Sequence, residues 1–201
     1  MFIQVIQGSI TDRSELRAMI ERWDEQLAPH AIGWLGTTAG LTANDDFVAL
    51  ARFGSEDAAR ANSERPEQHQ WWMETSKLFS GDVIFHDCRE VDLMRGGGSD
   101  DAGFVQIIQG RARDVARLRE MNTQFERFAG DYRPDLLGSA VALHGDGGFT
   151  QAAYFTTEAE ARAGESAEAP AELKPILEEE MSLLEDLRFF DLQEHWLSSP
   201  R

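Results

Sequence analysis

The chain contains nearly the same sequence twice. Residues 2–8 (FIQVIQG) reappear as residues 104–110 (FVQIIQG), at an offset of 102 residues. The offset continues without a gap for about sixty positions, so that Phe53, for example, meets Phe155. A repeat of this length predicts that the fold is built from two copies of one structural unit.

Length and composition fit a globular protein of two ordinary domains. The 201 residues divide into halves of about 100, which is a usual domain size. The formal net charge of -17 argues against nucleic acid, whose binding depends on neutralising phosphates with Lys and Arg. It also disfavours anionic membrane surfaces. We therefore expect neither a nucleic-acid partner nor a membrane partner.

Cysteine usage and hydropathy predict a cytoplasmic protein. Cys88 is the single cysteine, so no disulfide forms within the chain, which fits a reducing compartment. No basic segment followed by an apolar run opens the sequence, so we expect no signal peptide. No apolar run approaches the roughly 20 residues that span a bilayer. Cys88 itself is open to two interpretations, a reactive thiol beside Arg89 or a small buried hydrophobe.

Hydrophobic periodicity in the first repeat predicts the order β-α-β-β-α-(α)-β, which is a β-α-β-β-α-β unit with one added helix. Thr11 or Asp12 can cap a helix whose apolar residues recur at helical spacing, and Pro29 ends it. Ser55 and Pro66 are typical residues at helix starts. The expected elements are a strand at 2–8, a helix between 12 and 29, strands at 34–41 and 47–53 forming a hairpin, helices after 55 and 66, and a last strand at 83–93.

The second repeat predicts the same order. Its last strand is expected near 189–197, at an offset of 104, because two residues are gained before it. We therefore divide the chain into a first ferredoxin-like repeat at 1–94 with the candidate pocket, a Gly/Ser/Asp linker at 95–102, and a second repeat at 103–201 that acts mainly as a structural mate.

This element order predicts an α+β fold of two ferredoxin-like repeats. Such a β-α-β-β-α-β unit has four mostly antiparallel strands with helices on one face. The uncovered face of the sheet has to be buried, and the second copy is the obvious partner. We expect the two sheets to pack face to face about a pseudo-two-fold axis within one chain, and further oligomerisation stays open.

A run in the first repeat resembles a known family. Residues 65–72 (RPEQHQWW) are followed by 77–79 (KLF), Gly81 and 83–87 (VIFHD). Together with the element order, this run resembles the dimeric α+β barrel superfamily and its antibiotic-biosynthesis-monooxygenase-like group. The resemblance covers both halves and implies a fused, single-chain version of the usual homodimeric barrel.

The resemblance implies small-molecule chemistry in a pocket between the sheet and the helices. Members include cofactor-independent oxygenases of aromatic substrates, haem-degrading enzymes, isomerases and proteins with no known activity. The haem-degrading members use an asparagine, a tryptophan and a histidine ligand, and this chain has no residue-by-residue match to that set. The resemblance therefore implies no required cofactor and leaves haem open.

The two repeats differ where a pocket is expected. Aromatic and polar residues of the first repeat mostly correspond to small or aliphatic residues in the second. The pairs are Trp34 with Leu136, Asn62 with Gly164, His69 with Ala171, Trp71 with Leu173, Trp72 with Lys174 and, at an offset of 104, His86 with Phe190. Because ligand pockets combine aromatic walls with a few polar groups, these differences place the candidate site in the first repeat.

His86 is the candidate catalytic residue, as a general base toward a phenol or enol or as a ligand for a metal or haem. The alternative is a structural histidine in the core or at the sheet edge, whose ring nitrogens form hydrogen bonds with a neighbouring residue. Trp34, His69, Trp71 and Trp72 are candidate substrate-binding residues. Adjacent residues point about 100° apart on a helix, so we expect at most one of Trp71 and Trp72 to face the centre of a pocket. A core role for both, and a solvent-facing His69, stay open.

Several motifs are missing from the sequence. It has no Cys-x-x-Cys, no His-Glu-x-x-His, no phosphate-binding glycine loop and no Gly-x-Ser-x-Gly, so we expect no metal and no nucleotide. Two functions stay open. One is a monooxygenase-like enzyme that oxidises a small aromatic or polyketide-like molecule without a cofactor. The other is a non-catalytic protein that binds a small ligand or haem.

Overall fold

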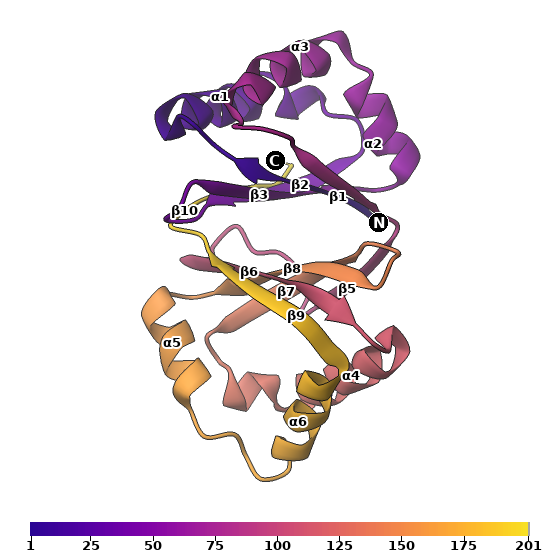
Figure 1. Cartoon of the computed structure of the whole chain (residues 1–201), viewed down its shortest axis with the longest axis vertical. Coiled ribbons are helices and arrows are strands. Elements are labelled where there is room, and N and C mark those ends of the chain that lie inside the picture. The colour runs from indigo at the N-terminus through magenta and orange to yellow at the C-terminus, as the bar shows by residue number, and fades with distance from the viewer. Residues whose placement is uncertain (201) are drawn as a thin grey trace. The chain divides into compact units, whose positions relative to one another are not determined.

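The computed structural model describes residues 1–200 and divides the chain into two compact units. Unit 1 comprises Met1–Val91 and the segment from Asp191 onward, and unit 2 comprises Asp92–Phe190. Each unit contains one five-stranded sheet with its α-helices on one face (Figure 1). The predicted α+β class, with two ferredoxin-like units in one chain, is confirmed.

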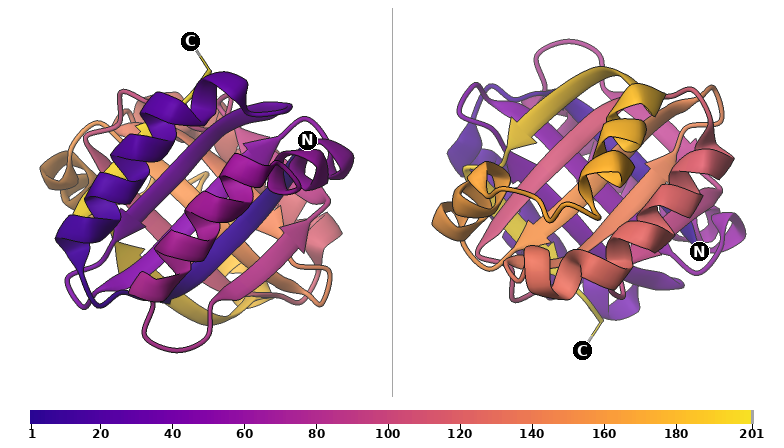
Figure 2. Two further views of the ribbon diagram at one scale, coloured as in Figure 1. Left: turned by 90° about the horizontal axis from the view of Figure 1, so that it is seen from above. Right: turned by 90° about the horizontal axis from the view of Figure 1, so that it is seen from below.

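Unit 1 follows the predicted order of elements. Its segments are β1 (Phe2–Ser9), α1 (Arg13–Gln26), the 3₁₀ helix η1 (Ala28–His30), β2 (Trp34–Leu41), β3 (Asp46–Phe53), α2 (Glu56–Ser63), α3 (Pro66–Thr75), the 3₁₀ helix η2 (Ser76–Leu78), β4 (Ile84–Cys88) and β10 (Glu194–Ser198). The strand order is β10-β2-β3-β1-β4. Helices α1 and α3 lie side by side across this sheet (Figure 2, left).

Local chemistry fixes the helix starts. The Asp12 carboxylate accepts a hydrogen bond from the backbone N–H of Glu15 at 3.0 Å and caps α1. The Ser55 hydroxyl accepts one from the N–H of Ala58 at 3.1 Å and caps α2. Pro66 is the first residue of α3, where its missing N–H costs no helical hydrogen bond. These three predicted helix starts are confirmed.

Unit 2 repeats this order with differences toward its end. Its segments are β5 (Glu90–Met94), β6 (Phe104–Ala112), α4 (Val115–Tyr132), β7 (Leu136–Leu143), β8 (Gly148–Phe155), α5 (Glu158–Ser166), α6 (Lys174–Leu183) and β9 (Leu184–Asp191). The strand order is β5-β7-β8-β6-β9, and α4 and α6 lie on one face of the sheet (Figure 2, right). Among residues 1–200, no helix combines the length and hydropathy that crossing a membrane requires.

The last predicted strand of each repeat is divided between the two sheets. Residues 83–93 form β4 and β5, and β5 lies beside β7 in the sheet of unit 2. After β9, the chain forms β10, which pairs antiparallel with β2 in unit 1. The prediction of one continuous strand at 83–93 and one near 189–197 is therefore wrong. The exchanged strands cover the edges of β2 and β7, whose backbone groups would otherwise lack partners.

The strands of residues 1–200 thus form two separate sheets and do not close into one barrel. The face-to-face packing of the two sheets stays a prediction. The strand exchange also means that the sequence repeats and the structural units end at different residues, since the unit boundaries lie between 91 and 92 and between 190 and 191.

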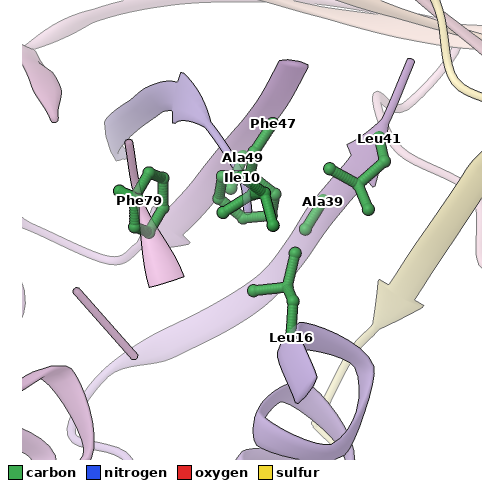
Figure 3. Close-up of a cluster of buried hydrophobic side chains, with 7 residues drawn as sticks. All are labelled: Ile10, Leu16, Ala39, Leu41, Phe47, Ala49 and Phe79. Atoms are coloured by element: carbon green, nitrogen blue, oxygen red, sulfur yellow. The ribbon is translucent and has the colours of Figure 1, made fainter. Parts of the chain in front are cut away.

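The core of unit 1 lies between the sheet and its helices. One cluster of buried side chains joins the connection between β1 and α1, the helix α1, the strands β2 and β3 and the segment after η2 (Figure 3). Its members are Ile10, Leu16, Ala39, Leu41, Phe47, Ala49 and Phe79. A second cluster consists of Phe2, Trp34, Phe53 and Ala59. The Phe47 and Phe79 rings meet edge to face, with centroids 5.7 Å apart.

Close approach of β10 to β2 makes a specific stability prediction. A Cβ added at Gly40 would lie 2.5 Å from the carbonyl oxygen of Glu194 and 2.6 Å from Cδ1 of Leu192. We expect Gly40→Ala to lower the free energy of unfolding by about 1–3 kcal/mol, the usual effect of overpacking. Urea denaturation followed by tryptophan fluorescence measures this change.

The matched control is Gly54→Ala. The nearest atom to a Cβ at Gly54 is the Gly33 carbonyl oxygen at 3.8 Å, which is ordinary contact. We expect this variant to unfold like the parent protein or slightly later. Equal unfolding of the two variants would contradict the tight β10–β2 packing.

Candidate functional site

A cavity of about 120 Å³ lies between the sheet of unit 1 and its helices α1, α2 and α3. All five tryptophans of the chain line it, although they are spread from one end of the sequence to the other. They are Trp23 on α1, Trp34 on β2, Trp71 and Trp72 on α3, and Trp196 on β10. Phe47, Phe53 and Phe79 complete the aromatic lining.

The indole rings are held in place by one another and by hydrogen bonds. Trp23 meets Trp34 edge to face with ring centroids 5.0 Å apart, and its other neighbour Trp71 is 6.5 Å away. The indole N–H of Trp23 donates to Oε1 of Gln68 at 2.8 Å. Those of Trp34 and Trp71 donate to the Thr37 hydroxyl at 2.9 Å and to the backbone carbonyl of Met19 at 2.8 Å. The aromatic wall is therefore fixed before any ligand enters.

Two side-chain amides present donors to this cavity. Oδ1 of the buried Asn62 accepts from the backbone N–H of Ile32 at 3.1 Å and from Nη1 of Arg65 at 3.0 Å. These donors fix the orientation of the amide, so its NH₂ group points the other way. Within residues 1–200, neither this NH₂ group nor that of Gln68 has a hydrogen-bond acceptor. Both line the cavity and are available to a ligand.

The C-terminal strand completes one side of the cavity. Trp196 and Ser198 reach it from β10, and Asp24 reaches it from α1. The Ser198 hydroxyl lies 2.9 Å and 3.0 Å from the two carboxylate oxygens of Asp24 and donates to this carboxylate. Asp24 is the carboxylate among the lining residues, so it is the group there that can accept a proton.

The structure brings together three of the five predicted site residues. Trp34, Trp71 and Trp72 all line the cavity. Both adjacent tryptophans border the cavity, which is also lined by Gln68 and Thr75 of the same helix. His69 is exposed on α3 and does not line the cavity.

His86 lies on the opposite face of the sheet from the cavity. The ring of Phe85 packs against Trp72 at 5.4 Å, and Oδ1 of Asp87 accepts a hydrogen bond from the cavity residue Gln4 at 2.9 Å. Successive side chains of a strand point to opposite faces, so His86, which lies between these two residues, points away from the helices. The structure therefore does not bring His86 together with the three tryptophans.

The cavity does not fit haem. Haem iron is held by histidine, cysteinate, methionine or tyrosinate, and none of these residue types is among the residues that line the cavity. Among residues 1–200, no group of three or more His, Cys, Asp or Glu side chains is arranged to hold a metal ion.

Unit 2 contains a smaller and more polar cavity, of about 50 Å³. Helices α4 and α6 contribute Asn122 and Glu180, and β8 contributes Gln151. The correspondence of Trp71 with Leu173 and of Trp72 with Lys174 is wrong in the structure. An offset of 102 from Pro66 would begin the helix at 168, but α6 begins at Lys174 because residues 167–173 form a longer connection.

Sequence reasoning missed Trp23, Trp196, Asp24 and Gln68 as cavity residues. Trp23 carries the signal of an apolar helix stripe, which predicts core packing as readily as a pocket. Trp196 has no local signal, because its place depends on the pairing of β10 with β2. Asn62 does differ between the repeats, and that difference is a usable signal.

The chain is similar in structure to several crystal structures over nearly its whole length. A candidate monooxygenase from Lactobacillus acidophilus NCFM matches with a TM-score of 0.74 and 14% identity, covering 98% of this chain and 95% of that protein. A second candidate monooxygenase, from Fusobacterium nucleatum subsp. nucleatum, matches with a TM-score of 0.76 and 9% identity, covering 98% of this chain and 94% of that protein. An anthrone oxidase-like protein matches with a TM-score of 0.61 and 8% identity, covering 98% of this chain and 92% of that protein.

These likenesses, and one to a ferredoxin-fold protein related to antibiotic biosynthesis monooxygenases, confirm for the fold the resemblance that the sequence predicts. No protein-family model and no curated protein sequence matches the chain.

Burial of Glu180 predicts a pH-dependent effect on stability. Desolvation raises the pKa of this carboxyl above its ordinary value of 4.5. Between these two pKa values the native state binds more protons than the unfolded state, so the contribution of Glu180 to stability falls as the pH rises through that window. We expect Glu180→Gln to match the parent protein near pH 4 and to be more stable than it at pH 7.5. Urea denaturation at both pH values measures the difference.

The neighbouring Glu179 provides a control of opposite sign. Hydrogen bonding to Arg117 lowers the pKa of Glu179, and the two side chains lie 2.5 Å apart. We expect Glu179→Gln to be less stable than the parent protein at pH 7.5. If Glu180→Gln gains no stability relative to the parent protein between pH 4 and pH 7.5, the raised pKa of Glu180 is contradicted.

Cys88 behaves as a buried hydrophobe in the structure. Its side chain is inaccessible, its thiol lies 3.6 Å from the backbone carbonyl of His86, and burial raises the pKa of the thiol to about 11. Because the thiolate is the reactive form, we expect iodoacetamide at pH 8 to label native protein far more slowly than urea-unfolded protein. Mass spectrometry measures the labelling, and equal rates in the two states would contradict this expectation.

Proposed function

We propose that unit 1 binds a small, planar aromatic molecule of polyketide-like chemistry and oxidises it with molecular oxygen, without a cofactor. The observation that carries the proposal is the convergence of all five tryptophans on one cavity that also contains unpartnered amide donors. Aromatic walls with a few oriented polar groups are typical of ligand-binding sites.

The lining of the cavity favours a ligand that is both aromatic and oxygenated. Indole faces and edges pack well against flat rings. The NH₂ groups of Asn62 and Gln68 donate hydrogen bonds, so their natural partners are carbonyl or phenolate oxygens. A hydrocarbon ligand without an acceptor atom would leave both donors unsatisfied inside an apolar site, which costs free energy. A hydroxylated aromatic ketone satisfies both requirements.

The likeness to a protein described as anthrone oxidase-like supports a particular reaction class. In that class, a methylene group activated by neighbouring aromatic rings becomes a carbonyl group. One oxygen atom of O₂ enters the new C=O, and the other leaves as water with the two methylene hydrogens. The methylene carbon supplies all four electrons that O₂ takes up, so the reaction balances without a reductant.

Asp24, Asn62 and Gln68 have separate roles in this proposal. Removal of a proton from the activated carbon gives an enolate that can react with O₂, and we assign the role of proton acceptor to Asp24, which lines the cavity. The Ser198 hydroxyl holds the Asp24 carboxylate in position. The amides of Asn62 and Gln68 stabilise the enolate oxygen by hydrogen bonding, because they are already oriented toward the cavity.

Turnover of an anthrone-type hydroxylated tricyclic compound tests the proposal. We expect O₂ consumption and quinone formation by the parent protein, both measured directly. Asp24→Asn should lower kcat by about 100-fold or more, the usual contribution of a general base, while keeping the hydrogen bond from Ser198. Asn62→Ala should lower it less, by about tenfold to a hundredfold.

His86→Ala is the matched control. Because His86 points away from the cavity, we expect this variant to retain turnover. Loss of turnover in His86→Ala together with full activity of Asp24→Asn would overturn our assignment of the base and favour the sequence-based assignment of His86.

A non-catalytic small-ligand binding protein is the second candidate function. The observation that favours it is the absence of any histidine from the lining of the cavity. Since every tryptophan lines the site, ligand binding should quench the intrinsic fluorescence strongly. Saturable quenching without O₂ consumption or product would support this second function over the first.

A further inference from the structure

The cavity of unit 2 lies at the place that corresponds to the tryptophan-lined cavity of unit 1. At the constant offset of 102, Asn122 takes the place of Ile20, and Gln151 takes the place of Ala49. Asp92 is the third residue of β5, as Trp196 is the third residue of β10. Polar residues in unit 2 therefore stand where unit 1 has apolar and aromatic ones.

Three of these polar side chains have no partner within residues 1–200. The Glu180 carboxyl and the amides of Asn122 and Gln151 form neither hydrogen bonds nor ion pairs with the protein. Asp92 and Arg119, in contrast, form an ion pair at 2.7 Å, so their charges compensate each other. The apolar remainder of the lining, including Phe149, offers no donor or acceptor. The three unpartnered residues are all partly exposed, so their polar groups are accessible to a ligand as well as to water.

We propose that this cavity is a second ligand site, which binds a small primary ammonium ion. The carboxylate of Glu180 supplies the negative charge that Arg119 does not neutralise, and the amide oxygens of Asn122 and Gln151 supply two neutral acceptors. A primary ammonium group has three N–H donors and can satisfy one acceptor with each. An anion would meet the unpaired carboxylate and is disfavoured.

The volume of the cavity limits the size of the ligand. A cavity needs about 10–15 Å³ for each water-sized group, so about 50 Å³ accommodates roughly three to five such groups. Methylammonium and ethylammonium, with two and three non-hydrogen atoms, fit this limit. The site would therefore bind short primary amines and exclude amines with bulky or branched substituents.

Isothermal titration of the full-length protein with methylammonium chloride tests the proposal. We expect saturable binding of one ion per chain at neutral pH and no saturable binding of tetramethylammonium, which has the charge but no N–H donor. Glu180→Gln keeps the shape of the side chain and removes its charge, and we expect it to bind at least tenfold more weakly. Gln151→Ala introduces the residue that unit 1 carries at this position, so it should fold normally and also bind more weakly.

A control in unit 1 separates this site from the tryptophan-lined cavity. Asp24 is the carboxylate of that cavity, so Asp24→Asn should bind methylammonium like the parent protein if the ion occupies unit 2. No saturable binding by the parent protein, or unchanged affinity in Glu180→Gln, would overturn the proposal. Loss of binding in Asp24→Asn alone would place the ion in unit 1 and would equally overturn it.

Discussion

The antiparallel pairing of β10 with β2 is the interaction on which unit 1 depends. It places Trp196 opposite Ala39 and Ser198 opposite Thr37, so that two residues near the end of the chain line the tryptophan-lined cavity. The backbone of β2 gains a partner along an edge that would otherwise be open. Since Gly40 lets the chain before β10 approach closely, the strand lies tight against the sheet. The geometry of the site therefore depends on a contact between segments about 160 residues apart in the sequence.

The fold was predictable where local chemistry decides the structure. The carboxylates of Asp12 and Asp114 occupy the same capping position in the two units, and each accepts a hydrogen bond from the N–H three residues later. The division of residues 83–93 was not predictable in the same way. The local sequence predicts one strand over these residues. Which sheet each part joins depends on which sheet edge lacks a partner strand, and those edges belong to β2 and β7, which are far away in sequence.

The candidate site was predictable in part, and the errors have physical causes. Comparing the repeats selected Trp34, Trp71 and Trp72, which line the cavity. For the two residues of α3 the comparison used positions that do not correspond in the structure, because α6 begins later than the offset predicts. The same comparison selected His86, but a strand alternates faces with every residue, so His86 and Phe85 lie on opposite sides of the sheet. The polar cavity of unit 2 went unnoticed because the comparison considered the residues that the second repeat lost. The decisive positions are those where it gained polarity, such as Gln151 in place of Ala49.

Two copies of one structural unit within a single chain allow the two cavities to differ. In a symmetric homodimer one sequence forms both cavities, so a substitution that adds a tryptophan to one adds it to the other. A single chain with two copies is free of that constraint. Here all five tryptophans line the cavity of unit 1, while the corresponding cavity of unit 2 holds a carboxyl and two amides. These three side chains are partly exposed and form no hydrogen bonds or ion pairs with protein partners within residues 1–200, so they are free to bind a small polar ligand in place of water. The two units thus keep one backbone plan and have diverged in the chemistry of the space beneath their helices.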